Sequence, residues 1–542
     1  MNSKILLVKN IHIDRQYTNV LSYSEAQMLE LCQSNLVAQA DNYSFLRPTG
    51  SIMAGFTYAQ CLQANYIAFQ NPDYSNKWFF AWIDDVIYKG DKNTEITFTV
   101  DAWSTWFDKW QKKVCFINRQ HVNNDTIGLH TIPENIDVGE VIQESITEDE
   151  SYGNDFGYWI AVASSWKIKD GSTGDEALES NKGTQNSGIT VYDNAVFGTQ
   201  LFFIKITELS SFKNLELLLR RTNVDKHIED VENIFILPNV AIKEDKLIEH
   251  TASVGGRNFS FYTMSYDLTP EKFNTVINKI TSFSDYTPKN NKCFVYPYNY
   301  LFVSNNQGSN NIYKYEDFNS EKCIFENQFS ISIGGSGRIV PKNYKGMTTN
   351  DDEALALGKY PTCGWSSDAF TNWLTQNSVN MAVSLGLTTG AIASTIATGG
   401  VTAPIIAGAV MSIAGNVGNT IGQFYQASLL PNIDGGQATG DVIWACNRNK
   451  FTFRQMRVKT EYLKIIDDYF TRFGYAIKSL AMPNITGRKY WNYVEIGASE
   501  EIGYGEVPAK YMDTINNACR RGVTIWHNHE NVGNYSLDNT IV

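Results

Sequence analysis

A run of 65 residues without a charged or histidine side chain, from Ala369 to Ile433, is the feature that most constrains the fold of this chain. The charged fraction of the whole chain is 19%, so the composition changes abruptly here. Two apolar stretches, 381–398 and 401–421, lie on either side of Gly399-Gly400. Each stretch is close to the ~20 residues that a helix needs to cross a bilayer. The pattern predicts a helical hairpin with a tight turn.

Three interpretations of this segment stay open. It forms a buried helical pair in a soluble core, a membrane segment that stays hidden until triggered, or a permanent transmembrane hairpin. Its many Asn, Thr, Ser and Gly residues make a poor permanent anchor, and no Lys/Arg cluster lies nearby to set an orientation. The patterns at 386–390 and 418–422 place two glycines four residues apart, which allows membrane helices to approach closely.

If the segment acts on a membrane, its apolar residues and the break between the two stretches carry that activity. The candidate membrane-active residues are Met381, Leu385, Leu387, Ile392, Ile396, Gly399, Gly400, Val401, Pro404, Ile405, Ile406, Val410, Ile413, Val417 and Ile421.

The rest of the chain is predicted to be mainly β with a few helices. An aromatic and β-branched run at 78–88 is followed by a turn, and 95–100 then alternates with period two, which indicates a β-hairpin. Apolar residues at helical spacing predict helices over 24–37, 207–221, 269–281 and 458–473, the last one ending at Gly474. The helix at 269–281 is expected to begin with a Thr-Pro-Glu cap.

The net charge of −12 argues against a broad grip on nucleic acid, because affinity for phosphates comes mainly from Lys and Arg. An acidic wall is still compatible with a DNA conduit, because it repels DNA and lets it slide. The simpler interpretation is that the negative charge only keeps the chain soluble. The eight cysteines are scattered without a CxxC pair, which is typical of reduced core residues in a protein made in a cytoplasm. The first residues lack a long apolar region, so no signal peptide is expected.

Motifs of catalysis are missing from the sequence, which contains no G-x-S-x-G, P-loop or H-E-x-x-H pattern. His527 and His529 would share one face of a strand, as metal ligands or as part of a polar terminal strand. The acidic residues 148–150 could be the catalytic carboxylates of a hydrolase or part of a solvated loop. The Gly-rich stretch 333–338 could bind an anion or form a turn. His121, beside Arg119, is interpreted as a structural hydrogen bonder, with a catalytic base as the alternative. We expect no enzyme activity, no metal and no cofactor.

Several sequence strings occur in an order and spacing typical of one protein family. They are ITFTVDAWSTW (96–106), CFINRQH (115–121), PENIDVG (133–139), KCFVYPYNYL (292–301), FGY (473–475), MPNI (482–485), RKYWNY (488–493), NACRRGVTIWH (517–527) and NVGNYS (531–536). Together they resemble the tail knob, or distal tail tube, proteins of small short-tailed phages that infect Gram-positive bacteria. Residues from about 150 to 260 show no such match.

The resemblance implies a homohexameric tube of β-barrel or β-sandwich subunits at the tail tip of the virion, with viral DNA passing through the lumen without specific binding. A hydrophobic loop of each subunit would plug the tube, then leave it and form a pore in the host cytoplasmic membrane. Residues 369–433 match that loop by position and composition. Other tail proteins would bind the proximal end. A wall-binding tail adhesin without membrane activity is the alternative.

Four parts of the chain are expected on these grounds. Residues 1–150 form the first part of a β-rich tube domain, and 441–542 complete it with a helix and strands. Residues 151–365 form a β-rich middle or outer domain that contains the helices near 207–221 and 269–281. Residues 366–440 form the hydrophobic membrane-active loop.

Overall fold

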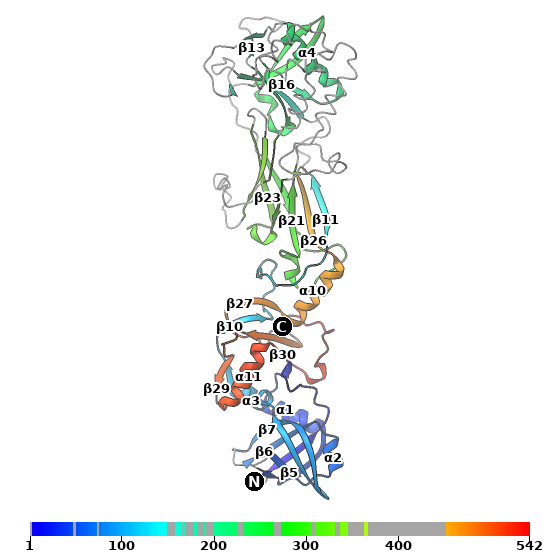
Figure 1. Ribbon diagram of the computed structural model, residues 1–542, viewed down its shortest axis with the longest axis vertical. Helices are drawn as coiled ribbons and strands as arrows, with labels where there is room; N and C mark the ends of the chain where they lie inside the picture. Colours follow the sequence, from blue (N-terminus) through cyan, green and yellow to red (C-terminus); the bar gives the residue numbers. More distant parts are fainter. Residues whose placement is uncertain are drawn as a thin grey trace, which may run out of the picture. The chain divides into compact units, whose positions relative to one another are not determined.

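The chain consists of two compact units, each assembled from more than one segment of the sequence (Figure 1). Unit 1 contains Met1–Glu140, Ser284–Tyr298 and Val458–Val542, which are far apart in the sequence, whereas unit 2 contains Val141–Phe283 and Asn299–Arg457, which only residues 284–298 separate. Strands outnumber helices in both units, so the prediction of a mainly β fold with a few helices is confirmed. The computed structural model describes residues 3–46, 50–72, 75–148, 158–164, 166–168, 178–180, 189–190, 199–224, 231–264, 273–305, 309–330, 336–344, 363–366 and 451–542.

A seven-stranded antiparallel sheet forms the first part of unit 1, in the order β3-β1-β6-β7-β8-β5-β4. The predicted hairpin is confirmed as β7 and β8, in which Val86 pairs with Ile96. One face carries a core that includes Ile5, Leu7 and Ile67, because alternate residues of a strand point to the same side. The strands are β1 (Lys4–Val8), β3 (Leu36–Asp41), β4 (Ser44–Leu46), β5 (Ser51–Ala54), β6 (Tyr66–Asn71), β7 (Lys77–Gly90) and β8 (Asn93–Val100).

A five-stranded sheet joins the two ends of the chain within unit 1, in the order β2-β30-β28-β10-β27. β2 runs parallel to β30, with Val20 opposite Ile525. Trp491 and Trp526 are fully buried against this sheet, with ring centroids 5.0 Å apart. The strands are β2 (Asn19–Leu21), β10 (Cys115–Gln120), β27 (Tyr475–Ala481), β28 (Trp491–Ile496) and β30 (Val523–Trp526), with the separate pair β9 (Trp110–Lys112) and β29 (Gly503–Gly505).

Local sequence signals mark the start of α1 and the end of α10 in unit 1. Ser24 and Gln27 form a reciprocal capping box at the start of α1. The helix α10 ends at Gly474, as predicted, where φ is +66° and the backbone N–H donates to the Phe470 carbonyl at 2.8 Å. The helices are α1 (Glu25–Ser34), α2 (Tyr58–Leu62), α3 (Ala102–Trp106), α10 (Thr460–Phe473) and α11 (Ala509–Arg521), with 3-10 turns η2 (Phe107–Lys109), η8 (Asn291–Phe294) and η12 (His529–Asn531).

Unit 2 contains three larger sheets and one strand pair. The sheet β17-β12-β16-β19-β18, which β15 extends, has β12 in its interior, and Ile160 to Ala163 of this strand are fully buried. α4 packs on β18 and β19 through an apolar face that includes Leu215 and Leu218. The other groups are β11-β26-β21-β22, β20-β23-β24-β25 and the pair β13-β14.

Most elements of unit 2 are short strands. They are β11 (Val141–Glu148), β12 (Tyr158–Ser164), β13 (Trp166–Ile168), β14 (Leu178–Ser180), β15 (Ile189–Thr190), β16 (Thr199–Ile206), β17 (Val231–Pro238), β18 (Leu247–Val254), β19 (Arg257–Met264), β20 (Phe273–Asn278), β21 (Asn299–Ser304), β22 (Asn310–Tyr313), β23 (Lys322–Ser330), β24 (Ser336–Lys342), β25 (Cys363–Ser366) and β26 (Thr452–Val458). The helical elements are η4 (Leu209–Ser211), α4 (Phe212–Val224), η6 (Asn239–Ala241), η7 (Glu244–Lys246) and η9 (Tyr315–Asp317).

The predicted helix at 269–281 is wrong. Residues 273–278 form β20, which pairs antiparallel with β23, and Ile277 lies opposite Cys323. Burial alternates along the strand, with Thr275 and Ile277 inside. The apolar spacing indicated a helix, but three successive β-branched residues, 275–277, favour the extended form once a partner strand is present, and Val276 is then exposed. The other helix predicted in this region, at 207–221, corresponds to α4 and the preceding turn η4.

Replacing Gly474 with alanine is expected to destabilise unit 1 by at least about 1–3 kcal/mol, because its φ of +66° and ψ of −152° suit glycine alone. A Cβ atom there would also lie 2.2 Å from the Gln120 carbonyl oxygen. Urea unfolding of the purified chain measures the loss. Gly533→Ala is the matched control, with φ of +83° and no atom within 4 Å of the new Cβ. Equal losses in the two variants would contradict the role given to the close approach at Gly474.

Candidate functional site

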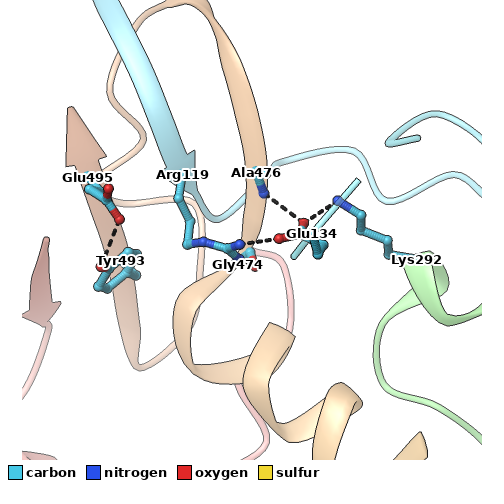
Figure 2. Close-up of polar contacts among 7 residues, drawn as sticks. All are labelled: Arg119, Glu134, Lys292, Gly474, Ala476, Tyr493 and Glu495. Carbon is cyan, nitrogen blue, oxygen red and sulfur yellow. Dashed lines mark hydrogen bonds and ion pairs between the residues drawn. The ribbon is translucent and has the colours of Figure 1, made fainter. Parts of the chain in front are cut away.

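A buried ion cluster in unit 1 is centred on Glu134 (Figure 2). The Glu134 side chain is 0% exposed and accepts from the Lys292 ammonium, the Arg119 guanidinium and, at 2.9 Å, the Ala476 backbone N–H. Arg119 also donates to the Gly474 carbonyl at 2.8 Å. A buried carboxylate with these partners has its lone pairs satisfied, so the cluster tolerates its low-dielectric surroundings.

Lys292 is the cation that comes from the short middle segment of unit 1, 284–298. Its ammonium lies 5.2 Å from the ring centroid of Tyr475 and 5.7 Å from that of Phe470, so aromatic faces complete its environment. Burial lowers the pKa of Lys292, and the Glu134 carboxylate opposes that shift. The Lys292–Glu134 pair therefore ties the middle segment of unit 1 to its first segment.

A second buried carboxylate, Asp467 of α10, holds the same middle segment. It accepts from the Tyr286 hydroxyl at 2.7 Å, the Lys289 backbone N–H at 2.8 Å and the Asn290 side-chain amide at 2.8 Å. The Asn290 backbone N–H adds a bond of 3.0 Å. Burial and the Asp467 carboxylate together raise the pKa of Tyr286, which keeps its hydroxyl protonated as a donor.

Asp125 supplies the third carboxylate. It accepts from the Asn291 backbone N–H at 3.0 Å and from the Tyr475 hydroxyl at 2.6 Å. Three successive residues, 290–292, thus each bind a different carboxylate of unit 1. We call the set of Asp125, Glu134 and Asp467 with residues 290–292 the carboxylate clamp. The clamp has a structural role, because each carboxylate accepts hydrogen bonds from donors of the protein itself.

His121 lies beside this clamp and is fully buried. Its Nδ1 accepts from the Tyr493 backbone N–H at 2.8 Å, so its Nε2–H donates to the Thr471 carbonyl at 3.0 Å. Burial, with the Arg488 charge as a second cause, lowers the pKa of His121 to about 3. The geometry agrees with its interpretation as a structural hydrogen bonder.

The two C-terminal histidines do not share a strand face, because β30 ends at Trp526, before both of them. That expectation was wrong, since the chain turns into η12 at this point. His527 contacts the Ser22 hydroxyl at 2.8 Å and the Asn492 side chain at 3.0 Å. In the described part of the chain, no group of three or more His, Cys, Asp or Glu residues is placed to hold a metal ion.

The other candidates are only partly described. Glu148 ends β11, whereas 149–150 lie outside the described residues. Of the Gly-rich stretch, 336–338 are described and begin β24, where Arg338 donates to the Gln328 side chain at 2.8 Å. The uncharged segment 369–433, with all its candidate membrane-active residues, lies outside the described residues.

Among the helices that the structure describes, none is long and apolar enough to cross a membrane.

Sequence reasoning did not single out the carboxylate clamp, although Glu134, its partner Arg119 and Lys292 lie in strings that carried the family resemblance. Glu134 stands in PENIDVG, Arg119 in CFINRQH and Lys292 at the start of KCFVYPYNYL. A charged residue next to several aromatic and aliphatic ones is the signal for a buried ion pair, because Lys, Arg and Glu are seldom fully buried without a partner. The partners themselves lie too far apart in sequence to be matched by spacing.

The first 111 residues match the family model of the N-terminus of the caudoviral major tail protein. With the strand-rich fold, this match defines the class of the chain, which is a structural protein of a phage tail. Residues 261–540 match the C-terminal domain of the tail knob protein gp9 of Bacillus phage phi29. Because this match covers more than half of the chain, the chain belongs to the phage tail knob family, and the predicted resemblance is confirmed.

Curated relatives match most of the chain. It is 23% identical to the tail knob protein gp9 of Bacillus phage phi29 over 540 residues, and 21% identical to that of Bacillus phage PZA over 535, with 88% of each chain covered in both cases. The solved structure of the tail knob protein gp12 of bacteriophage C1 superimposes with a TM-score of 0.60 at 13% identity over the full length of both chains. At that identity, the likeness shows a shared fold.

Glu134→Gln is expected to destabilise the chain by about 3–5 kcal/mol, because two buried cations lose their counter-charge. Urea unfolding of the purified chain tests this. Glu501→Gln is the matched control, since Glu501 pairs with Lys113 at 2.6 Å on the exposed surface, where ion pairs contribute little. A loss for Glu134→Gln as small as that of the control would show that the clamp does not stabilise unit 1.

Acid is expected to destabilise unit 1 through His121. Its pKa in the folded chain is about 3, below the ordinary value of 6.5, so between these two values only the unfolded chain takes up the proton. The stabilisation is therefore complete above about pH 6.5 and is lost as pH falls toward 3, by up to ~1.4 kcal/mol per pH unit. Unfolding free energies of the chain and of His121→Gln between pH 7 and 4 measure the effect. Parallel pH profiles would contradict it.

Proposed function

We propose that this tail knob protein forms the distal tail tube through which viral DNA is ejected. We propose further that its 369–433 segment plugs the tube and then enters the host cell membrane. The observation that carries the proposal is the loss of all charge over 65 residues in a chain with a 19% charged fraction. Such a segment suits a dry enclosure before release, where its apolar side chains meet each other instead of water.

The tube itself requires several copies of the chain. A ring of six, as the family resemblance implies, needs contacts between two different faces of neighbouring subunits, because such heterologous contacts close into rings. The net charge of −12 supports a lumen that repels DNA and lets it slide. In this proposal, 1–150 and 441–542 build the tube wall and 151–365 the middle or outer domain. The grouping of the first and last segments in unit 1 supports this assignment.

The position of the carboxylate clamp supports the proposal that the 369–433 segment moves while unit 1 stays fixed. α10, which carries Asp467, is the next described helix after the uncharged segment. Four donor groups converge on the Asp467 carboxylate, so this helix is firmly held in unit 1. Release of the 369–433 segment would then leave the tube wall unchanged. Burial of the apolar surface of the segment in the bilayer would then be the only driving force for membrane entry.

Deleting 375–428 and bridging the gap with a Gly/Ser linker is expected to preserve rings in negative-stain images but to abolish dye release from liposomes. The purified full-length chain at the same concentration is the reference. A second variant, Leu387→Asp with Ile413→Asp, keeps the length of the segment and places a charge in each stretch. Each charge costs about 2.5–3.5 kcal/mol in a membrane helix, so leakage should again be lost. Equal leakage from the deletion variant and the full chain would refute the membrane role.

A further inference from the structure

A polar cleft of about 700 Å³ lies in unit 1, outside the carboxylate clamp. α1 and its flanking residues Tyr23 and Asn35 line it on one side, and Asn10, His12 and 527–530 contribute the rest of its lining. Leu31 is its one aliphatic lining residue, and neither Lys nor Arg lines it. The volume is in the range of small-molecule sites, roughly 300–1,000 Å³, but the lining is far more polar than usual. An occupant must therefore be recognised by hydrogen bonds.

His529 provides a fixed hydrogen-bond donor in this cleft. It is 8% exposed, and its Nε2 accepts from the His12 backbone N–H at 3.2 Å. The remaining proton of the neutral ring therefore sits on Nδ1, and no group of the described residues accepts it. The His529 backbone N–H also donates to the Tyr23 hydroxyl at 3.0 Å, which holds the residue in place. A more than nine-tenths buried side chain thus lines the cleft with an unused donor.

The His12 ring adds a flat surface beside this donor. It stacks on the His529 ring with a centroid distance of 5.3 Å and an angle of 19°. His12 is exposed, so the second face of its ring is open to an occupant. The carbon face of a pyranose ring packs well against a flat ring of this kind.

Two carboxylates, Glu30 of α1 and Glu530 of η12, line the cleft from different elements. Within the described part of the chain, neither has a cation partner. They favour ligands that carry several hydrogen-bond donors, and they repel anions. The amides of Asn10 and Asn35 add further donors and acceptors. Because the described residues hold no group of three metal-ligating side chains, a bound metal ion does not explain the arrangement.

We propose that this cleft binds a neutral or amino sugar unit of a glycan. Sugar hydroxyls both donate and accept hydrogen bonds, which matches the carboxylates, the amides and the His529 Nδ1–H. The stacked imidazole pair supplies the flat contact, and the absence of lining cations argues against anionic sugars. The assignment goes beyond the role of the chain in the tail tube and does not rest on it.

Binding of the purified full-length chain to an array of neutral and amino oligosaccharides tests the proposal, with sulfated and sialylated sugars on the same array. We expect saturable binding to at least one neutral or amino sugar and none to the anionic ones. Binding only to anionic sugars, or no saturable binding at all, would overturn the proposal.

Calorimetric titration with the best-bound sugar then locates the site. Glu30→Ala and Asn10→Ala are expected to weaken its affinity at least 10-fold. Gln33→Ala is the matched control, since Gln33 is exposed on the same helix as Glu30 but does not line the cleft. Glu30 is itself exposed, so unchanged thermal unfolding of Glu30→Ala separates lost binding from lost folding. Wild-type affinity in both cleft variants would place the sugar elsewhere and refute the assignment.

Discussion

Three carboxylates hold unit 1 together, of which Glu134 and Asp467 are buried and Asp125 is half-buried. Asp125 and Glu134 come from its first segment and Asp467 from its last, and all three bind residues 290–292 of the middle segment. These segments are separated by more than 140 residues of chain, so each contact closes a long loop at an entropic cost. Buried ions that lose a partner are strongly destabilising. The three segments are therefore stable only in combination, which explains how the sheets at the two chain ends share one unit.

This arrangement bears on the proposed role of the chain in the tail. The uncharged stretch 369–433 lies between two parts of the sequence that the structure describes, and α10 follows it. In the described sequence, β26 comes before α10, whose Asp467 accepts from the Tyr286 hydroxyl and the Asn290 backbone N–H. The cleft between α1 and residues 527–530 is a separate feature, because none of its lining residues belongs to the clamp.

Local signals carried most of the correct predictions. The hairpin of β7 and β8 followed from alternation around a turn, and the end of α10 followed from Gly474 at the end of an apolar stripe. β20 was mistaken for a helix because apolar residues at 273, 276 and 277 have helical spacing, although Val276 is exposed on the opposite face of the strand from Ile277. Its pairing with β23 decided the outcome. The histidine pair failed for a related reason, since the end of β30 depends on its neighbours in the sheet.

The sequence by itself determined the strand-rich character of the chain and the place where charge disappears, because these depend on composition and short-range periodicity. It also indicated the family, through strings whose order and spacing resemble it. Only the tertiary structure decided which charges meet. Lys292 and Glu134 are 158 positions apart, and His12 and His529 are 517 apart. No local pattern encodes such pairs. They exist because burial forces each polar group to find a partner, and the folded sheets determine which partner lies within reach.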